Sequence, residues 1–140
     1  FCKESKMAKR INIVFDKLGQ GSLECVGFNT FRCLGKKGLR YPRDLTIDPE
    51  KKGTKKHPYF SQEYVCNYPG IGEVRVPCRM NYSVLIWGQR GIYIHEWPGK
   101  ATYAANGGPT AGCIHVEQGD AKEIYDWVDD KTRVVIDYDW

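Results

Sequence analysis

The sequence predicts a mostly β domain with one short helix near its C-terminus. Three observations support this fold class: short apolar–polar alternations recur along the chain, glycine and proline residues separate them, and only one segment has helical periodicity. The length of 140 residues fits one domain, residues 1–140, with a single core. With 41% hydrophobic and 27% charged residues, the composition excludes disordered, collagen-like and coiled-coil chains.

The first half of the chain predicts a hairpin followed by a long loop. Arg10–Phe15 alternates apolar and polar residues, glycine-containing residues 17–22 form a turn, and residues 23–28 resume extended character. Residues 35–58 are rich in Pro, Gly, Lys and Asp, which predicts a loop. We expect short strands in five further segments: residues 30–34, 64–67, 72–76, 82–87 and 91–94.

The predicted helix starts at Asp120, with Glu123 three residues later as in a capping box. Residues 129–131 end it. Its apolar residues fall at i, i+3, i+4 and i+7: Ala121, Ile124, Tyr125 and Val128. A last strand, Arg133–Tyr138, places Val134, Ile136 and Tyr138 on one face and Val135 on the other.

Charge is distributed unevenly. Residues 1–60 hold 14 Lys and Arg against 6 Asp and Glu, whereas residues 61–140 hold 7 against 11. The basic residues are scattered, and the densest group, residues 51–56, lies beside prolines and glycine, which is typical of a solvated loop. We therefore expect no nucleic-acid partner. We also expect no membrane span, because the longest apolar runs, such as Ser83–Trp87, are strand-sized.

Two segments carry residues suited to nucleophilic catalysis. Cys113 follows Gly112 in the glycine-rich stretch 106–116, where a tight turn exposes a side chain and leaves backbone N–H groups beside it. Acyl transfer needs a thiol, a base and donors for the oxyanion. His95, 18 residues earlier, is the candidate base, and the N–H groups of Gly112 and Cys113 are the candidate donors.

Other interpretations of these residues remain open at this point. Cys113 alone also fits a small buried residue or half of a disulfide, and His95 and His115 each fit an ordinary core or surface histidine. Metal binding by His95, Cys113 and His115 is disfavoured because neither C-x-x-C nor H-x-x-x-H spacing occurs. We expect no metal and no cofactor.

The same residues carry a resemblance to a known family. Ile94-His95, then Thr110-Ala111-Gly112-Cys113-Ile114-His115-Val116, then Asp120-Ala121 and the helix, resemble the catalytic end of the L,D-transpeptidase (YkuD-type) family. Residues 11–28 are similar to the opening hairpin of that family. The resemblance implies an L,D-transpeptidase-like β-sandwich with a short helix near the C-terminus.

The resemblance also implies a reaction. Cys113 would be the nucleophile, His95 its base, and the N–H groups around Gly112 and Cys113 the oxyanion hole. Family members attack the bond between the third residue of the peptidoglycan stem tetrapeptide and D-alanine, forming a thioester. An amine acceptor then gives a cross-link, a free D-amino acid gives exchange, and water gives L,D-carboxypeptidase activity.

The sequence departs from the family pattern at three positions. Ala111 replaces the histidine of the Ser/Thr-His-Gly-Cys motif, His115 replaces an arginine or asparagine, and Glu96 replaces a small residue. We assign Thr110, Ala111 and His115 to the oxyanion and substrate region. For Glu96 we favour a solvated charge over a role in orienting His95. Three aromatic residues are candidate walls of the substrate cleft, with ordinary packing as the alternative: Tyr93, Trp97 and Tyr103.

The resemblance sets the expected partners and location. We expect a monomer that acts on peptidoglycan stem peptides in the periplasm or after secretion. One form of this expectation is an antibacterial effector domain that is delivered into the periplasm of another bacterium and neutralised by an immunity protein. Two alternatives stay open: a non-catalytic wall-binding or adaptor domain on the same fold, and a cysteine peptidase acting on proteins.

The chain has six cysteines. A catalytic Cys113 leaves five, which allow at most two intramolecular disulfides. The pairs nearest in sequence are Cys25 with Cys33 and Cys66 with Cys78, which would leave Cys2 unpaired, although other connectivities stay possible.

Overall fold

The computed structural model describes residues 8–36, 38–47, 55–56, 60–68, 72–79, 81–88, 90–96, 113–129 and 131–140, with the backbone alone for 55–56, 60–68 and 72–79. Its elements in chain order are β1 (Arg10–Phe15), β2 (Gln20–Cys25), β3 (Asn29–Leu34), β4 (Asp44–Thr46), β5 (Lys55–Lys56), β6 (Phe60–Tyr68), β7 (Gly72–Arg79), β8 (Ser83–Trp87), β9 (Ile92–Glu96), β10 (Ile114–Val116), α1 (Asp120–Trp127) and β11 (Arg133–Tyr138). The predicted class, mostly β with one short helix near the C-terminus, is confirmed.

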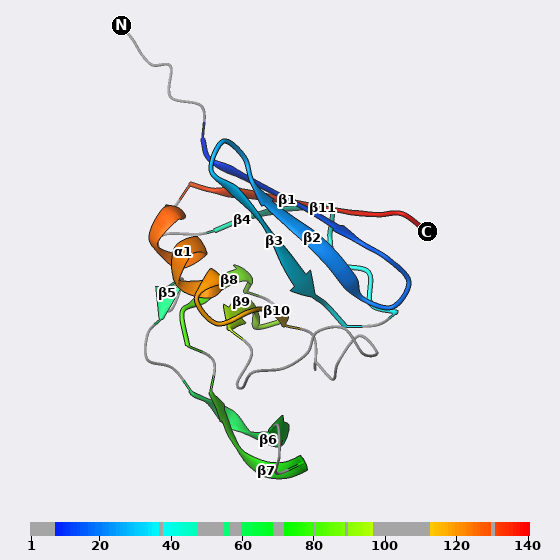
Figure 1. Ribbon diagram of the computed structural model, residues 1–140, viewed down its shortest axis with the longest axis vertical. Coiled ribbons are helices and arrows are strands. Elements are labelled where there is room, and N and C mark those ends of the chain that lie inside the picture. The colour runs from blue at the N-terminus through cyan, green and yellow to red at the C-terminus, as the bar shows by residue number, and fades with distance from the viewer. Residues whose placement is uncertain are drawn as a thin grey trace, which may run out of the picture.

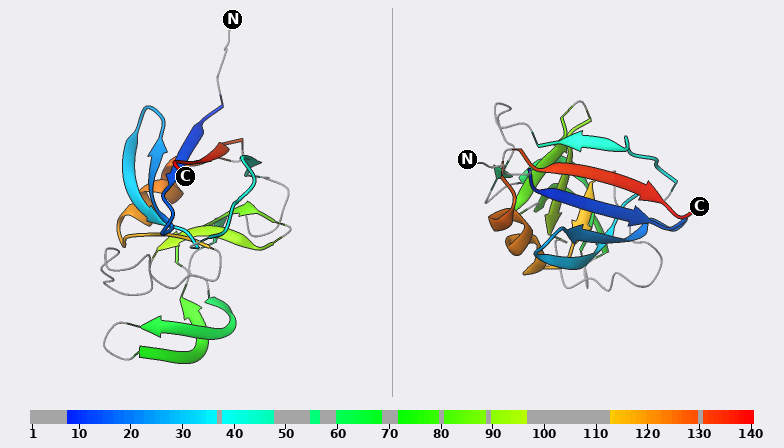
Figure 2. Two further views of the ribbon diagram at one scale, coloured as in Figure 1. Left: turned by 90° about the vertical axis from the view of Figure 1, so that its right-hand side faces the viewer. Right: turned by 90° about the horizontal axis from the view of Figure 1, so that it is seen from above.

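One curled sheet forms the body of the fold (Figure 1). Its strand order is β4-β11-β1-β2-β3-β10-β9-β8-β5, and the pairs β1–β11 and β9–β10 are parallel. Strand β4, at one edge, lies against β8 near the other edge, so the sheet is nearly closed. The half that contains β1, β2, β3 and β11 therefore covers the half that contains β8, β9 and β10, as the view from above shows (Figure 2). These halves are the two layers of the expected sandwich.

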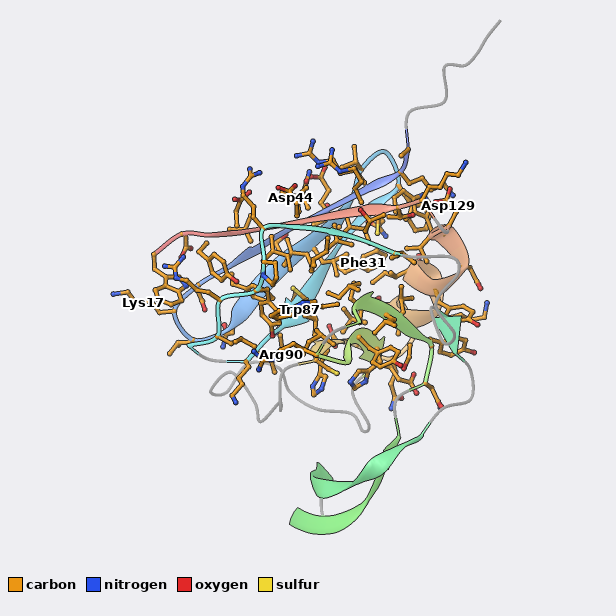
Figure 3. All side chains as sticks on the ribbon, turned by 180° about the vertical axis from the view of Figure 1, so that it is seen from behind. Lys17, Phe31, Asp44, Trp87, Arg90 and Asp129 are labelled. Carbon is orange, nitrogen blue, oxygen red and sulfur yellow. The ribbon has the colours of Figure 1, made fainter. Side chains whose placement is uncertain are left out.

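The core lies between the two halves and follows from strand alternation. In β1, Ile11, Ile13 and Phe15 are buried, whereas Asn12 and Val14 between them are half-buried and exposed, respectively. Phe31 of β3 lies among the side chains that fill this space (Figure 3). Each fully buried isoleucine contributes about 2–3 kcal/mol through removal of apolar surface from water, so this alternation is the main source of stability.

Helix α1 packs against β8 and β9 through Ala121 and Ile124. The predicted capping box is wrong: the helix begins after Gly119, which is the N-cap with φ 92°, and no side chain caps the first turn. A positive φ is costly for residues with a Cβ but not for glycine. The chain therefore enters the helix through Gly119, and Asp120 is already helical. None of the helices in the described ranges is long and apolar enough to cross a membrane.

The predicted loop over residues 35–58 contains two short strands. Asp44–Thr46 pairs with β11, and Lys55–Lys56 pairs with β8. The carboxylate of Asp44 accepts a hydrogen bond from the Arg133 guanidinium at 3.0 Å, and the Ile136 N–H donates to the Arg43 carbonyl. These strands form because a neighbouring strand offers open backbone groups, which their own composition does not reveal.

Neither predicted disulfide fits the strand registers. Cys25 lies opposite Asn29 in the β2–β3 pair, and Cys66 lies opposite Val74 in the separate β6–β7 hairpin. In both cases the expected partner cysteine is four residues farther along the opposite strand. Four residues of strand span about 13 Å, and a disulfide needs Cα atoms within about 7 Å. Cys25 and Cys33 are accordingly free thiols buried in the core, and Cys2 lies outside the described residues.

Candidate active site

Strands β9 and β10 run side by side and in parallel, and their register aligns two histidines. Ile94 pairs with Ile114, His95 with His115, and Glu96 with Val116. Ile94, Ile114 and Val116 point into the core between the sheet halves. By alternation, Tyr93, His95 and His115 point to the opposite face, and all three are buried. We call this opposite side the histidine face.

Cys113 immediately precedes β10, and its half-buried thiol lies against the start of β9. The Tyr93 backbone N–H donates to Cys113 Sγ at 3.4 Å, and the thiol donates to the Gly91 carbonyl at 3.8 Å. Continuing the β9–β10 register by one residue places Cys113 diagonally across from His95, with Cα atoms about 8 Å apart. Alternation assigns Cys113 to the same side of the β9–β10 pair as His95 and His115, while its thiol contacts the backbone of Gly91 and Tyr93.

Burial decides the protonation state of the Cys113 thiol. It raises the thiol pKa from 9.0 to about 11, because a thiolate loses hydration there, and the Tyr93 N–H lowers it only in part. At neutral pH the resting side chain is therefore the thiol, not the thiolate.

The imidazole of His95 is fixed by one hydrogen bond. Its Nδ1 lies 2.8 Å from the carbonyl oxygen of Glu96. Because a carbonyl can only accept, Nδ1 carries the proton and Nε2 of the neutral ring keeps its lone pair. Burial lowers the pKa of His95 from 6.5 to about 4, and the bond to Glu96 offsets this in part. His95 is thus a neutral base whose unprotonated nitrogen is Nε2.

The ring of His115 lies against the ring of His95. The ring centroids are 4.6 Å apart with an interplanar angle of 60°, an edge-to-face contact. Burial lowers the pKa of His115 well below its ordinary value, and the charge of a protonated His95 lowers it further. Both rings are therefore neutral near pH 7.

Glu96 differs from expectation. The sequence favoured a solvated charge, but the residue is only 7% exposed, so that prediction is wrong. All five residues of β9 are buried, which places Glu96 inside the fold and not on a solvated strand end. The group that orients His95 is the backbone carbonyl of Glu96.

The structure brings together four of the residues that the sequence singled out: Tyr93, His95, Cys113 and His115. Trp97, Tyr103, Thr110, Ala111 and Gly112 lie outside the described residues. Sequence reasoning missed three backbone groups that contact the site: the carbonyls of Gly91 and Glu96 and the N–H of Tyr93. Every residue carries such groups, so only the strand register could have revealed them.

This arrangement suits acyl transfer through a thiol better than metal chemistry. A thiol directly before β10 and a neutral imidazole with an unprotonated Nε2 on the paired strand β9 are the kinds of nucleophile and base that such a reaction needs. Across the part of the chain that the structure describes, no group of three or more His, Cys, Asp and Glu side chains is placed to hold a metal ion.

Comparison with solved structures supports the fold. An L,D-transpeptidase from Mycobacterium smegmatis superimposes with a TM-score of 0.58 at 19% identity, covering 91% of this chain and 58% of that one. L,D-transpeptidase 3 from Mycobacterium tuberculosis, in complex with a faropenem-derived adduct, gives 0.58 at 18% identity, covering 92% and 60%. An L,D-transpeptidase from Stackebrandtia nassauensis gives 0.62 at 18% identity, covering 96% and 58%. The chain thus spans about three fifths of the length of these proteins.

Sequence comparison identifies the family. A search of curated proteins finds no match. The sequence profile of the L,D-transpeptidase catalytic domain, YkuD, matches residues 40–136, well over half of the chain, and includes β9, β10 and α1. The chain therefore belongs to the L,D-transpeptidase (YkuD) catalytic domain family.

Proposed function

We propose that this chain is a cysteine-dependent acyltransferase that acts on the stem tetrapeptide of peptidoglycan, with residues 1–140 forming one catalytic domain. The observation that carries the proposal is the pairing of β9 with β10, where the Cys113 thiol contacts the start of β9 and the His95 ring on the same strand keeps an unprotonated Nε2. Family membership supports the substrate class. Such a substrate places the reaction outside the cytoplasm, in the periplasm or after secretion.

The proposed first step forms a thioester. Cys113 Sγ attacks the carbonyl carbon of the third stem residue, and its proton moves to His95 Nε2. The carbon–nitrogen bond to D-alanine then breaks, and His95 returns that proton to the departing amine. In the second step an amine or a water attacks the thioester and restores the thiol. The choice between cross-linking, exchange and hydrolysis depends on which acceptor enters.

The protonation states argue for proton transfer during the attack. A thiol with pKa about 11 and an imidazole with pKa about 4 do not form a resting ion pair. His95 therefore acts as a general base while the carbon–sulfur bond forms. In this proposal the N–H groups of Gly112 and Cys113 stabilise the oxyanion, and Thr110, Ala111, Tyr93 and Trp97 border the substrate. Delivery as an effector and an immunity partner stay predictions.

Mass spectrometry of muropeptides tests the function. Incubation of tetrapeptide-containing muropeptides with the wild-type protein should give loss, exchange or cross-linking at D-alanine, each with its own mass. Cys113→Ala should lower turnover at least ~10³-fold, and His95→Ala ~10²- to 10⁴-fold. Cys25→Ala, which removes a core thiol remote from the histidine face, is the matched control and should keep turnover within about twofold. Full activity of Cys113→Ala would refute the proposal.

One observation favours a second candidate, a non-catalytic wall-binding domain. The raised pKa of the Cys113 thiol leaves very little thiolate at pH 7. Such a domain would bind muropeptides with equal affinity in the wild type and in Cys113→Ala, and neither would change their masses. A cysteine peptidase would instead cleave a protein substrate and leave purified wall intact.

A further inference from the structure

The second histidine of the site has no role in the reaction as written above. His115 is 7% exposed, lies on the histidine face and contacts the His95 ring edge-to-face at 4.6 Å. A buried histidine costs more to desolvate than an apolar ring of similar size, so core filling alone does not explain this residue type. Its position next to the candidate base calls for an explanation.

Two neighbours limit the movement of His115. On one side the β9–β10 register pairs it with His95, and on the other the β3–β10 register pairs it with Leu34. Leu34 follows Cys33, whose side chain points into the core, so alternation places Leu34 on the histidine face. The His115 ring therefore sits between a buried leucine and the His95 ring.

The His95 ring has two restraints that differ in kind. The bond from Nδ1 to the Glu96 carbonyl holds one edge of the ring, but rotation about the bond from Cβ to the ring breaks only this one hydrogen bond, and packing supplies the remaining resistance. A rotation of about 180° would put Cδ2 in the place of Nδ1 and Cε1 in the place of Nε2, which breaks the bond to Glu96 and turns a C–H group toward the position of Nε2. The edge-to-face contact with His115 opposes that rotation.

We propose that His115 is a positioning residue for His95, whose ring contact keeps the imidazole oriented so that Nδ1 donates to the Glu96 carbonyl and Nε2 faces the thiol. This inference rests on the proposed function for its catalytic consequence, but the orientation of His95 can be measured without any reaction. It is a claim about ring packing, so an aromatic ring of similar size should replace His115.

Other ionisable groups near His95 are few among the described residues. On the histidine face they are Tyr93 and Cys113, and Tyr41 interacts electrostatically with the Cys113 thiol. Glu96 alternates to the other face of β9 but is also buried. A substitution at His115 leaves each of these residues in the chain, and the matched variants below separate loss of the ring contact from general loosening.

Nuclear magnetic resonance of the ring nitrogens tests the proposal on the intact, ¹⁵N-labelled protein. In the wild type at pH 7, we expect His95 as one tautomer protonated at Nδ1. In His115→Ala, we expect both tautomers and a His95 proton affinity raised at least tenfold, because water enters the space. In His115→Phe, we expect the wild-type spectrum. Ile136→Ala, which opens a cavity in the core, controls for general loosening and should leave His95 unchanged.

Turnover adds a second readout. We expect His115→Ala to lower kcat about tenfold and to shift the acid limb of its pH profile upward, with His115→Phe restoring both. Wild-type tautomer and titration in His115→Ala would overturn the proposal, as would the alanine spectrum in His115→Phe. If His115→Phe has the wild-type spectrum but loses turnover, His115 contacts the substrate directly and the positioning role is wrong. If neither the wild type nor any variant turns over substrate but the spectra are as expected, the proposed function is wrong and the positioning role stands.

Discussion

The two faces of the β9–β10 pair share one backbone but carry different kinds of side chain. One face carries Ile94, Ile114 and Val116 and lies in the core. The other carries His95 and His115, with the Cys113 thiol at its end. The same hydrogen-bonded ladder holds both, so the apolar face fixes the strand positions that set the geometry of the histidine face.

This contrast explains why buried histidines are tolerated here. Both have their pKa lowered by burial, which means that the fold keeps them neutral at a cost in solvation. The apolar face compensates through isoleucine and valine side chains with almost no exposed surface. Substitutions on the core face should therefore act on stability, and substitutions on the histidine face on chemistry.

The largest expected effect is a difference in alkylation rate between the Cys113 thiol and the cysteine thiols of the core. With its pKa near 11, Cys113 should react with iodoacetamide roughly 100-fold more slowly at pH 7 than an ordinary thiol, and about tenfold faster with each pH unit up to 11. Cys25 and Cys33, buried in the core, should stay unmodified while the protein is folded. Peptide mass spectrometry assigns each adduct, and denatured protein gives the reference rate. Fast, pH-independent labelling of Cys113 between pH 6 and 8 would reveal a resting thiolate–imidazolium pair and contradict the neutral site.

A cavity on the core face should show the next largest effect. Ile94→Ala removes a side chain that is 1% exposed, and we expect the free energy of unfolding to fall by about 2–5 kcal/mol. Urea unfolding measures the change, and turnover per folded molecule shows whether the histidine face survives. A stable variant without activity would mean that the two faces are not separable.

Acid should destabilise the protein through the histidine face. The pKa of His95 is about 4 in the folded protein and near 6.5 when unfolded, so the unfolded chain binds more protons between these values. The contribution of neutral His95 to the free energy of unfolding is therefore fully present above pH 6.5 and is lost as the pH falls toward 4. From pH 7 to pH 5, His95→Phe should lose about 2 kcal/mol less than the wild type in urea unfolding. Equal losses in both proteins would place the acid sensitivity elsewhere.

The smallest expected effect is a change in stability after a substitution at the exposed edge strand β4. Asp44→Asn removes the ion pair with Arg133, whose 3.0 Å contact joins β4 to β11. Both side chains are more than half exposed, so we expect a change within about 0.5 kcal/mol that disappears in high salt. Thermal unfolding at low and high salt measures it. A larger loss would show that closure of the sheet by β4 supports the site.

Strand alternation made the fold predictable. The patterns at Arg10–Phe15 and Arg133–Tyr138 reproduced β1 and β11, because burial on one face leaves a period of two in the sequence. The same period placed Tyr93 on the face of His95. The family motif singled out Cys113 and His95, whose catalytic roles stay predictions; the structure places His95 on the histidine face and Cys113 directly before β10.

The features that the sequence did not predict depend on contacts between segments that are distant in the sequence. Strands β4 and β10 have three residues each, too short for a pattern, and form only because β11 and β9 lie beside them. The proposed cysteine pairs failed because closeness in sequence does not give closeness across a hairpin. The capping box failed because a glycine with φ 92° already redirects the chain.

The parallel pairing of β1 with β11 bears on how the protein is made. Residues 10–15 lie beside residues 133–138, although more than a hundred residues separate them. As the chain leaves the ribosome, β1, β2 and β3 can associate early as a local meander, but one side of β1 has open backbone groups until β11 has been synthesised. The nascent chain thus carries an unprotected strand edge until residues 133–138 have been synthesised, and a chaperone that covers β1 during that interval would prevent association between chains.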